Sequence, residues 1–242
     1  MQQSHKAPPE LPTPLLPRRG ADAIAPAMLE DRILFTDGQA IVIDKPAGLP
    51  VDPPRRGGPS IASRLDELRC GFKRLPTVMH RLDQDTSGCL LLARNAGARA
   101  ALQRTFEARA VQKYYLAVIG REIAEESGEI DIALGKQSSA EAGWRMVADP
   151  RGQSAVTRWR RLAVKDGASL VEFRPVTGRT HQIRVHARLG FDCGIVGDRV
   201  YGTPGGAMLL HASRLVVPRT RHAAIDVTAP LPESFGAWRD DA

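Results

Sequence analysis

The sequence predicts an α+β fold, in which a mostly antiparallel mixed sheet carries flanking helices and a central basic cleft. Short apolar runs follow one another through turns, whereas a doubly wound fold would alternate each strand with a helix. Of the 242 residues, 43% are hydrophobic and 25% are charged, a balance typical of globular domains that excludes wholesale disorder. Positive charge falls in two blocks that lie far apart in the sequence, and a fold that joins them would form the cleft.

The first half of the chain predicts a hairpin, a helix, a buried strand and a second helix. Residues 33–44 hold two apolar runs around the turn Asp37-Gly38, as in a β-hairpin. Ser60 predicts the start of a helix whose apolar residues share one face, namely Ile61, Leu65 and Leu68. Residues 89–93 are entirely apolar, which predicts a buried strand. Asn95 then predicts the N-cap of a helix whose inward-facing residues are Ala98, Ala101, Leu102 and Phe106.

The second half predicts strands over 111–119, 155–164 and 169–174, the last two joined by a turn at 165–167. Thr180 predicts the start of a helix that runs to about Leu189 and ends at Gly190. Residues 209–217 and 224–227 predict a final hairpin, and residues 232–238 predict a short final helix. Six prolines fall within residues 1–30, which predicts an irregular arm followed by one folded domain over 31–242.

The charge distribution favours a polyanionic partner. The net charge is +7, and Arg supplies 28 of the 34 cations. Residues 50–115 carry 12 cations and 6 anions, and residues 174–222 carry 8 cations and 2 anions, so each block has a net charge of +6. Biased codon usage would also raise the Arg content, but it would not gather the charge into two blocks. Because the guanidinium fork suits phosphate, the sequence predicts nucleic-acid binding.

Cysteine usage and hydropathy predict a cytoplasmic protein without a membrane partner. Cys70, Cys89 and Cys193 are odd in number and widely spaced, as in reduced thiols and unlike a disulfide framework. No apolar run approaches the ~18 residues of a membrane span, and the N-terminal residues lack the apolar segment of a secretory signal.

The densest polar stretch, residues 80–88, comes directly before the predicted buried strand. The lead-in to a buried strand lies at a sheet end, where functional residues are common. Asp85, Thr86 and Ser87 are typical turn residues whose side chains bond their own backbone. Turn chemistry explains Asp83 poorly, because Asp83 lies before the turn and beside Arg81. Asp83 is therefore the candidate functional carboxylate.

A second polar stretch, residues 177–188, carries Arg184 one helical turn after Thr180 and Arg188 one turn later. Such a run is often only a solvated basic face. His181 and His186 are five residues apart, a spacing that places them on different faces of a helix. The sequence therefore predicts no metal site at these histidines.

Several segments, in order along the chain, together resemble the RluA-type RNA pseudouridine synthases. HRLDQDTSGCLLLA (80–93) is similar to the motif that carries the catalytic aspartate of that family, and KPAGLPV (45–51) is similar to its upstream loop. KYYLAV (113–118) resembles its K-x-Y-x-A element. The C-terminal block is matched by RPVTGRTHQIRVHARLG (174–190), GDRVYG (197–202), LLHASRL (209–215) and TAPLPESF (228–235). The resemblance implies the pseudouridine synthase fold, in the short form without a separate N-terminal RNA-binding domain.

The resemblance implies roles for several residues. Asp83 matches the catalytic aspartate, and Arg184 matches the arginine that pairs with it. Tyr115 matches the tyrosine that stacks on the target base, whereas its neighbour Tyr114 has the opposite strand face and is expected in the core. Arg81 resembles the arginine that fills the space of the extruded base. Further substrate-binding residues are expected at His80, Thr86, Arg179, His181 and Gln182, with Leu209 or Leu210 walling the uracil pocket.

The implied reaction converts uridine in ribosomal RNA, transfer RNA or both to pseudouridine. Because product and substrate are isomers, no redox cofactor or energy source is needed. RNA is the expected partner, with no obligatory protein partner and a monomeric state. Two other functions fit parts of the sequence: a non-catalytic RNA-binding relative, and a hydrolytic glycosidase that uses Asp83 and Asp85 as a carboxylate pair.

Overall fold

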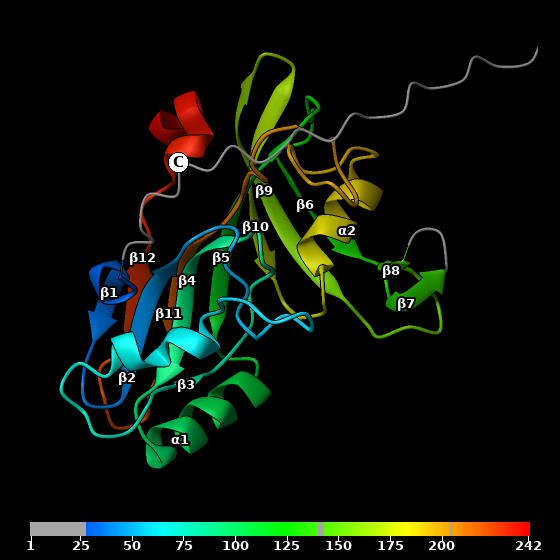
Figure 1. The fold of residues 1–242 in the computed structure, drawn as a ribbon. Helices are drawn as coiled ribbons and strands as arrows, with labels where there is room; N and C mark the ends of the chain where they lie inside the picture. Colours follow the sequence, from blue (N-terminus) through cyan, green and yellow to red (C-terminus); the bar gives the residue numbers. More distant parts are fainter. Residues whose placement is uncertain (1–27, 140–142, 204) are drawn as a thin grey trace, which may run out of the picture.

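The fold is built on one large mixed sheet (Figure 1). The structure is a computed structural model and describes residues 28–139, 143–203 and 205–242. Its strands are β1 (Ile33–Thr36), β2 (Ala40–Lys45), β3 (Thr77–Val78), β4 (Ser87–Ala93), β5 (Gln112–Ile119), β6 (Ser127–Asp131), β7 (Leu134–Ser139), β8 (Gly143–Ala148), β9 (Val156–Lys165), β10 (Ala168–Pro175), β11 (Leu210–Val217) and β12 (Ile225–Thr228). Its helices are α1 (Ala96–Glu107) and α2 (Gln182–Gly190), with 3-10 helices η1 (Glu30–Arg32), η2 (Ala62–Leu68) and η3 (Glu233–Asp241).

The sheet has the strand order β1-β2-β4-β11-β5-β10-β9-β6, while β3 pairs with β4 and β12 pairs with β11. Strands β7 and β8 form a separate two-stranded sheet. Among the pairings of these described strands, β4 with β11 is parallel and the others are antiparallel. The prediction of an α+β fold with a mixed, mostly antiparallel sheet is confirmed.

The central strands are apolar because both faces of the sheet are covered. On β4, Leu90 and Leu92 join a core that includes residues of α2 and η2, whereas Cys89 and Leu91 join a core that includes residues of α1. The predicted cap of α1 is confirmed, since the Asn95 side chain accepts the amide hydrogen of Ala98 at 2.9 Å. Ala98 and Leu102 of α1 are buried and Phe106 is partly buried. The inward orientation expected for Ala101 is wrong, because Ala101 is exposed.

Other elements depart from the sequence prediction. The segment after Ser60 forms the 3-10 helix η2, and the Ser60 hydroxyl accepts the amide hydrogen of Ser63 at 3.1 Å. The sequence analysis did not predict strands β6, β7 and β8. Most of their described residues are partly or fully exposed, so these strands lack an apolar pattern in the sequence. Residues 1–27 of the expected arm lie outside the described residues. Leu29, however, is completely buried in the core, so the folded part begins before residue 31.

No helix in the described ranges is both long and apolar enough to cross a membrane.

Gly88 is required where β4 meets β11. It pairs with Ala212 and has a φ of 104°, a backbone conformation that residues with a side chain rarely adopt. A Cβ atom at this position would lie 2.2 Å from the Ala212 carbonyl oxygen. The close approach of the two strands holds the 80–88 segment against the centre of the sheet.

The buried His211 on β11 predicts that the protein loses stability in mild acid. One ring nitrogen lies 2.9 Å from the Ser87 hydroxyl, and burial lowers the pKa of His211 to about 4. Between about pH 6.5 and pH 4, His211 binds a proton in the unfolded chain but stays neutral in the folded protein. This one group therefore lowers the free energy of unfolding by about 1.4 kcal/mol for each pH unit in that range. Urea titrations at pH 7 and pH 5 measure the loss. His211→Gln should show a smaller loss than the wild type, and an equal loss would refute this assignment.

Candidate active site

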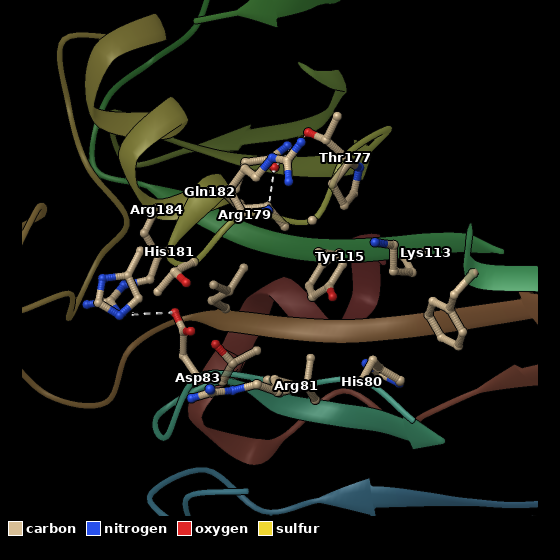
Figure 2. Close-up of a pocket in the computed structure, with 18 residues that line it drawn as sticks. His80, Arg81, Asp83, Lys113, Tyr115, Thr177, Arg179, His181, Gln182 and Arg184 are labelled. Atoms are coloured by element: carbon tan, nitrogen blue, oxygen red, sulfur yellow. Dashed lines mark hydrogen bonds and ion pairs between the residues drawn. The ribbon is translucent and has the colours of Figure 1, made fainter. Parts of the chain in front are cut away.

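A pocket of about 350 Å³ opens beside the centre of the sheet. It is lined by the segment before β4, by β5, by the segment that leads into α2, and by Leu210 of β11. Figure 2 shows Asp83, His181 and Arg184 at one end of this pocket, Tyr115 in the middle and Lys113 toward the other end. The fold thus brings together the two polar stretches, which lie about a hundred residues apart in the chain.

A buried lysine holds the turn that carries Asp83. The amide of Thr86 donates to the Asp83 carbonyl at 3.1 Å and closes the turn. The Lys45 ammonium donates to the carbonyls of Gln84, Leu49 and Pro46 at 3.0, 2.7 and 2.9 Å. Burial lowers the pKa of Lys45 to about 8. The KPAG segment therefore has a structural role here, which the sequence analysis did not assign.

Arg184 bridges two carboxylates. Its Nη1 donates to Oδ2 of Asp83 at 3.1 Å, as the motif match predicts. Its Nε and Nη2 donate to the two oxygens of Asp198 at 2.7 and 2.8 Å. Burial opposes the charge of both Arg184 and Asp198, but their mutual hydrogen bonds prevail, raising the pKa of Arg184 and lowering that of Asp198. The guanidinium is thereby fixed in place as a permanent cation beside Asp83.

Sequence reasoning missed Asp198, which is buried and holds Arg184. Its Oδ1 also accepts the amide hydrogens of Val200 and Tyr201 at 2.8 and 3.2 Å. Asp198 lies in the GDRVYG segment, so the resemblance pointed to the segment without giving the residue a role. Only the structure shows that Arg184 is buried, and a buried guanidinium needs more than the one hydrogen bond that Asp83 provides.

Tyr115 projects from β5 into the pocket and is only 8% exposed. Leu210 of the neighbouring β11 pairs with Ala117 and lines the same pocket. Within the described residues, the Tyr115 hydroxyl has no hydrogen-bond partner, and burial raises its pKa, so it is protonated and uncharged at neutral pH. Leu209 packs in the core cluster on the other face of the sheet, so Leu210 is the pocket-wall leucine.

Tyr114 is not a core residue, contrary to the expectation. It is partly exposed on the opposite face of β5, where the guanidinium groups of Arg174 and Arg214 lie 4.7 and 5.4 Å from its ring centre. Its hydroxyl donates to the Gln112 side chain at 2.9 Å. The two tyrosines do face opposite sides of the strand, but Tyr115 is the buried one.

His181, and not Thr180, stands at the N-cap of α2. It has a φ of 53°, in the left-handed region, and its ring turns toward the pocket. One ring nitrogen lies 2.9 Å from the Tyr201 hydroxyl, and the other lies 4.0 Å from Oδ2 of Asp83. Trp144 of β8, which the sequence analysis did not single out, stacks on His181 with ring centres 5.1 Å apart. Burial lowers the pKa of His181, which favours the neutral ring.

The other predicted substrate-binding residues line the pocket in different ways. His80 accepts the Leu91 amide hydrogen at 3.1 Å, and burial followed by the nearby Lys113 lowers its pKa to about 3. Thr86 is buried in the pocket wall. The Arg81 side chain is 79% exposed and lies 3.3 Å from Asp52.

Gln182, the first residue of α2, and Arg179, three residues before it, also line the pocket. The Gln182 side-chain amide is engaged by the protein itself, because it accepts from Thr177 and donates to Val156 and Thr157. Gln182 therefore supports the loop and offers the pocket little hydrogen-bonding capacity. The Arg179 Nε donates to the Ser154 carbonyl at 3.0 Å.

The pocket is basic, as the two charge blocks predict. Its lining includes Arg81 and Lys113 from the first block and Arg179 and Arg184 from the second, with Asp83 as the lining carboxylate. Asp85 is exposed and does not line the pocket, so the arrangement lacks the carboxylate pair of a glycosidase.

Comparison with known proteins shows which family this chain belongs to. The sequence matches the family described as RNA pseudouridylate synthase over residues 39–189. A protein of Zymomonas mobilis described as an uncharacterized RNA pseudouridine synthase is 48% identical over 212 residues, covering 86% of this chain and 97% of that protein. The ribosomal large subunit pseudouridine synthase C of Rickettsia bellii is 32% identical, covering 93% of this chain and 76% of that protein.

The fold agrees with the sequence comparison. The structure of human RNA pseudouridylate synthase domain containing 4 matches with a TM-score of 0.72 at 28% identity, covering 86% of this chain and 91% of that one. Human RNA pseudouridylate synthase domain containing 1 matches with a TM-score of 0.70, also at 28% identity, over 88% and 90% of the two chains. The protein therefore belongs to the RluA-type RNA pseudouridine synthases and is an isomerase that acts on RNA.

Proposed function

We propose that this protein isomerises specific uridines of ribosomal RNA, transfer RNA or both, with Asp83 as the catalytic carboxylate. The observation that carries the proposal is the placement of Asp83 beside Arg184 in a basic pocket walled by Tyr115. Ribosomal RNA is a substrate class suggested by the Rickettsia bellii relative, whose name assigns it to the large ribosomal subunit.

The chemistry requires little beyond one carboxylate. The bond between the ribose and the base nitrogen breaks, the uracil turns, and carbon 5 of uracil bonds to the ribose. The proton of carbon 5 is lost and the freed nitrogen gains one, so atoms balance without a cofactor. Asp83 acts on the ribose, either as a nucleophile or as a base that removes a ribose proton. The departing uracil spreads its negative charge over its own ring, so a second acid is not needed.

The target uridine must leave its base stack to react. An enzyme that reaches both the ribose and the far edge of the base works on a flipped or unpaired nucleotide. The pocket volume of about 350 Å³ lies at the lower end of the range for small-molecule sites and suits one nucleoside. Tyr115 and Leu210 offer flat and apolar surfaces for the uracil, and Arg81 is exposed enough to enter the vacated stack.

The direct test incubates the purified protein with unmodified transcripts of ribosomal and transfer RNA and maps pseudouridine at each position. We expect mass-neutral conversion at one or a few defined uridines. The absence of conversion in every ribosomal and transfer RNA would overturn the proposed substrate class.

We expect Tyr115→Phe to bind RNA normally but to form product about a hundredfold more slowly, because the hydroxyl relays the carbon 5 proton and the ring face is kept. Tritium release from RNA labelled at carbon 5 of uridine measures the step. Tyr114→Phe loses the same hydroxyl on the opposite face of β5 and serves as the matched control. If Tyr115→Phe released tritium at the wild-type rate, the Tyr115 hydroxyl would have no part in the reaction.

A further inference from the structure

A second hollow lies beside the active-site pocket. It has a volume of about 240 Å³ and shares Phe106, Lys113, Thr177, Gly178 and Arg179 with that pocket. Glu107 and Arg109, at the end of α1, complete its charged lining. We call this hollow, with Arg109, Lys113 and Arg179 as its three cations, the side groove. The shared residues make the side groove continuous with the pocket that holds Asp83.

Lys113 is the central cation of the side groove. It precedes Tyr115 by two residues on β5, so both side chains face the same side of the sheet. Figure 2 shows the Lys113 ammonium beyond Tyr115, away from Asp83. Within the described residues, it has neither a hydrogen-bond acceptor nor a carboxylate partner. A partly buried ammonium without a partner is unfavourable, and burial lowers its pKa accordingly. An anionic ligand in the groove would relieve this cost.

The other two cations are also free of carboxylates. Within the described parts of the chain, neither Arg109 nor Arg179 has an ion pair, and the Arg179 side chain donates through its Nε to the Ser154 carbonyl. Glu107, the carboxylate of the groove, accepts a hydrogen bond from Gln103 at 3.0 Å. Elsewhere on the surface, Arg158, Arg188 and Arg214 each pair with a carboxylate. The side groove therefore carries positive charge that the protein itself leaves unneutralised.

We propose that the side groove binds a backbone phosphate of the RNA strand that delivers the target uridine, with Lys113 as the main contact and Arg109 and Arg179 extending it. The inference rests on the proposed function, because continuity with the active-site pocket is what identifies the anion as a phosphodiester of the substrate. Lys113 is a binding residue in this scheme and takes no part in bond breaking. A phosphate held here would fix the strand while the uracil lies against Tyr115.

The test uses a synthetic RNA hairpin whose loop holds a uridine that the wild-type protein modifies. A series of these hairpins carries one neutral methylphosphonate linkage at successive positions around that uridine. For the wild-type protein, we expect one position to weaken binding about tenfold, as for a lost charged hydrogen bond. For Lys113→Met, the same methylphosphonate should cause no further weakening, because the contact is already absent. For Lys113→Met, the slope of log affinity against log salt concentration should be shallower than for the wild type by about 0.7.

Lys165→Met is the matched control. The Lys165 ammonium donates to the Ala237 carbonyl in η3, away from the lining of either hollow, so RNA binding should be unchanged. Equal sensitivity of wild type and Lys113→Met to every methylphosphonate would overturn the inference. So would a Lys113→Met protein that binds RNA normally but reacts slowly, because Lys113 would then act on the base. Pseudouridine formation by the wild type, measured on the same hairpins, tests the proposed function separately.

Discussion

Replacing Asp83 by Asn is expected to lower pseudouridine formation about a thousandfold or more, while folding and RNA binding persist. The substitution keeps the size of the side chain, and its oxygen can still accept the hydrogen bond from Arg184 that the carboxylate accepts at 3.1 Å. It removes the negative charge that serves as the nucleophile or the base. Single-turnover assays on the modified transcript measure the rate, and filter binding measures the affinity.

The matched control for this prediction is Asp85→Asn. Asp85 lies two residues away in the same turn, but it is exposed and outside the pocket, so its loss of charge should leave the rate near that of the wild type. If Asp83→Asn retained most of the activity, or if the two variants lost activity equally, Asp83 would not be the catalytic carboxylate.

Replacing Asp198 by Ala is expected to destabilise the fold by about 3–5 kcal/mol and to lower turnover as well. Arg184 is 8% exposed, and without Asp198 its buried guanidinium would keep only the single hydrogen bond to Asp83. An uncompensated buried charge costs about this much. Urea denaturation at neutral pH measures the free energy of unfolding. Asp198→Asn should fold better yet still turn over slowly, because an amide cannot accept both guanidinium hydrogen bonds that fix Arg184 beside Asp83.

Asp226→Asn provides the comparison for Asp198. Asp226 also binds an arginine through two hydrogen bonds, to Arg214 at 2.8 and 2.6 Å, but both side chains are nearly half exposed. Because exposed ion pairs contribute little, stability and activity should stay close to those of the wild type. A similar loss of stability in the two aspartate variants would show that burial is not the cause of the Asp198 effect.

Local sequence patterns predict the elements whose stability depends on their own residues. The uninterrupted apolar run of β4, the turn at Asp37-Gly38 and the cap at Asn95 each use short-range chemistry, and the structure contains all three. Strands β6 to β8 escape prediction because they lie at the sheet edge or in a separate hairpin, where few side chains are buried. Without an apolar face, a strand has no periodic signal in the sequence.

At the start of α2 and at Tyr114, tertiary contacts override the structure that the residue type predicts. Thr180 has the residue type of a cap, yet the tertiary contacts of His181 with Tyr201 and Trp144 favour a left-handed N-cap one residue later. Tyr114 is aromatic and flanks an apolar run, but its face of β5 meets Arg174 and Arg214 instead of the core. Residue type sets what a side chain can do, and its neighbours in space decide what it does.

The sequence by itself determined the α+β fold, the two basic blocks and the motifs that identify the family, including Asp83, Tyr115 and Arg184. The tertiary structure decided which groups hold these residues in place. Asp198 anchors Arg184, and Lys45 anchors the turn of Asp83 through three backbone carbonyls. The Lys45 contact with Gln84 spans 39 residues of the chain, and Asp198 lies 14 residues from Arg184, which itself reaches Asp83 across 101 residues. Local patterns do not encode these contacts, because buried charges and donors find their partners only when the sheet and helices have packed.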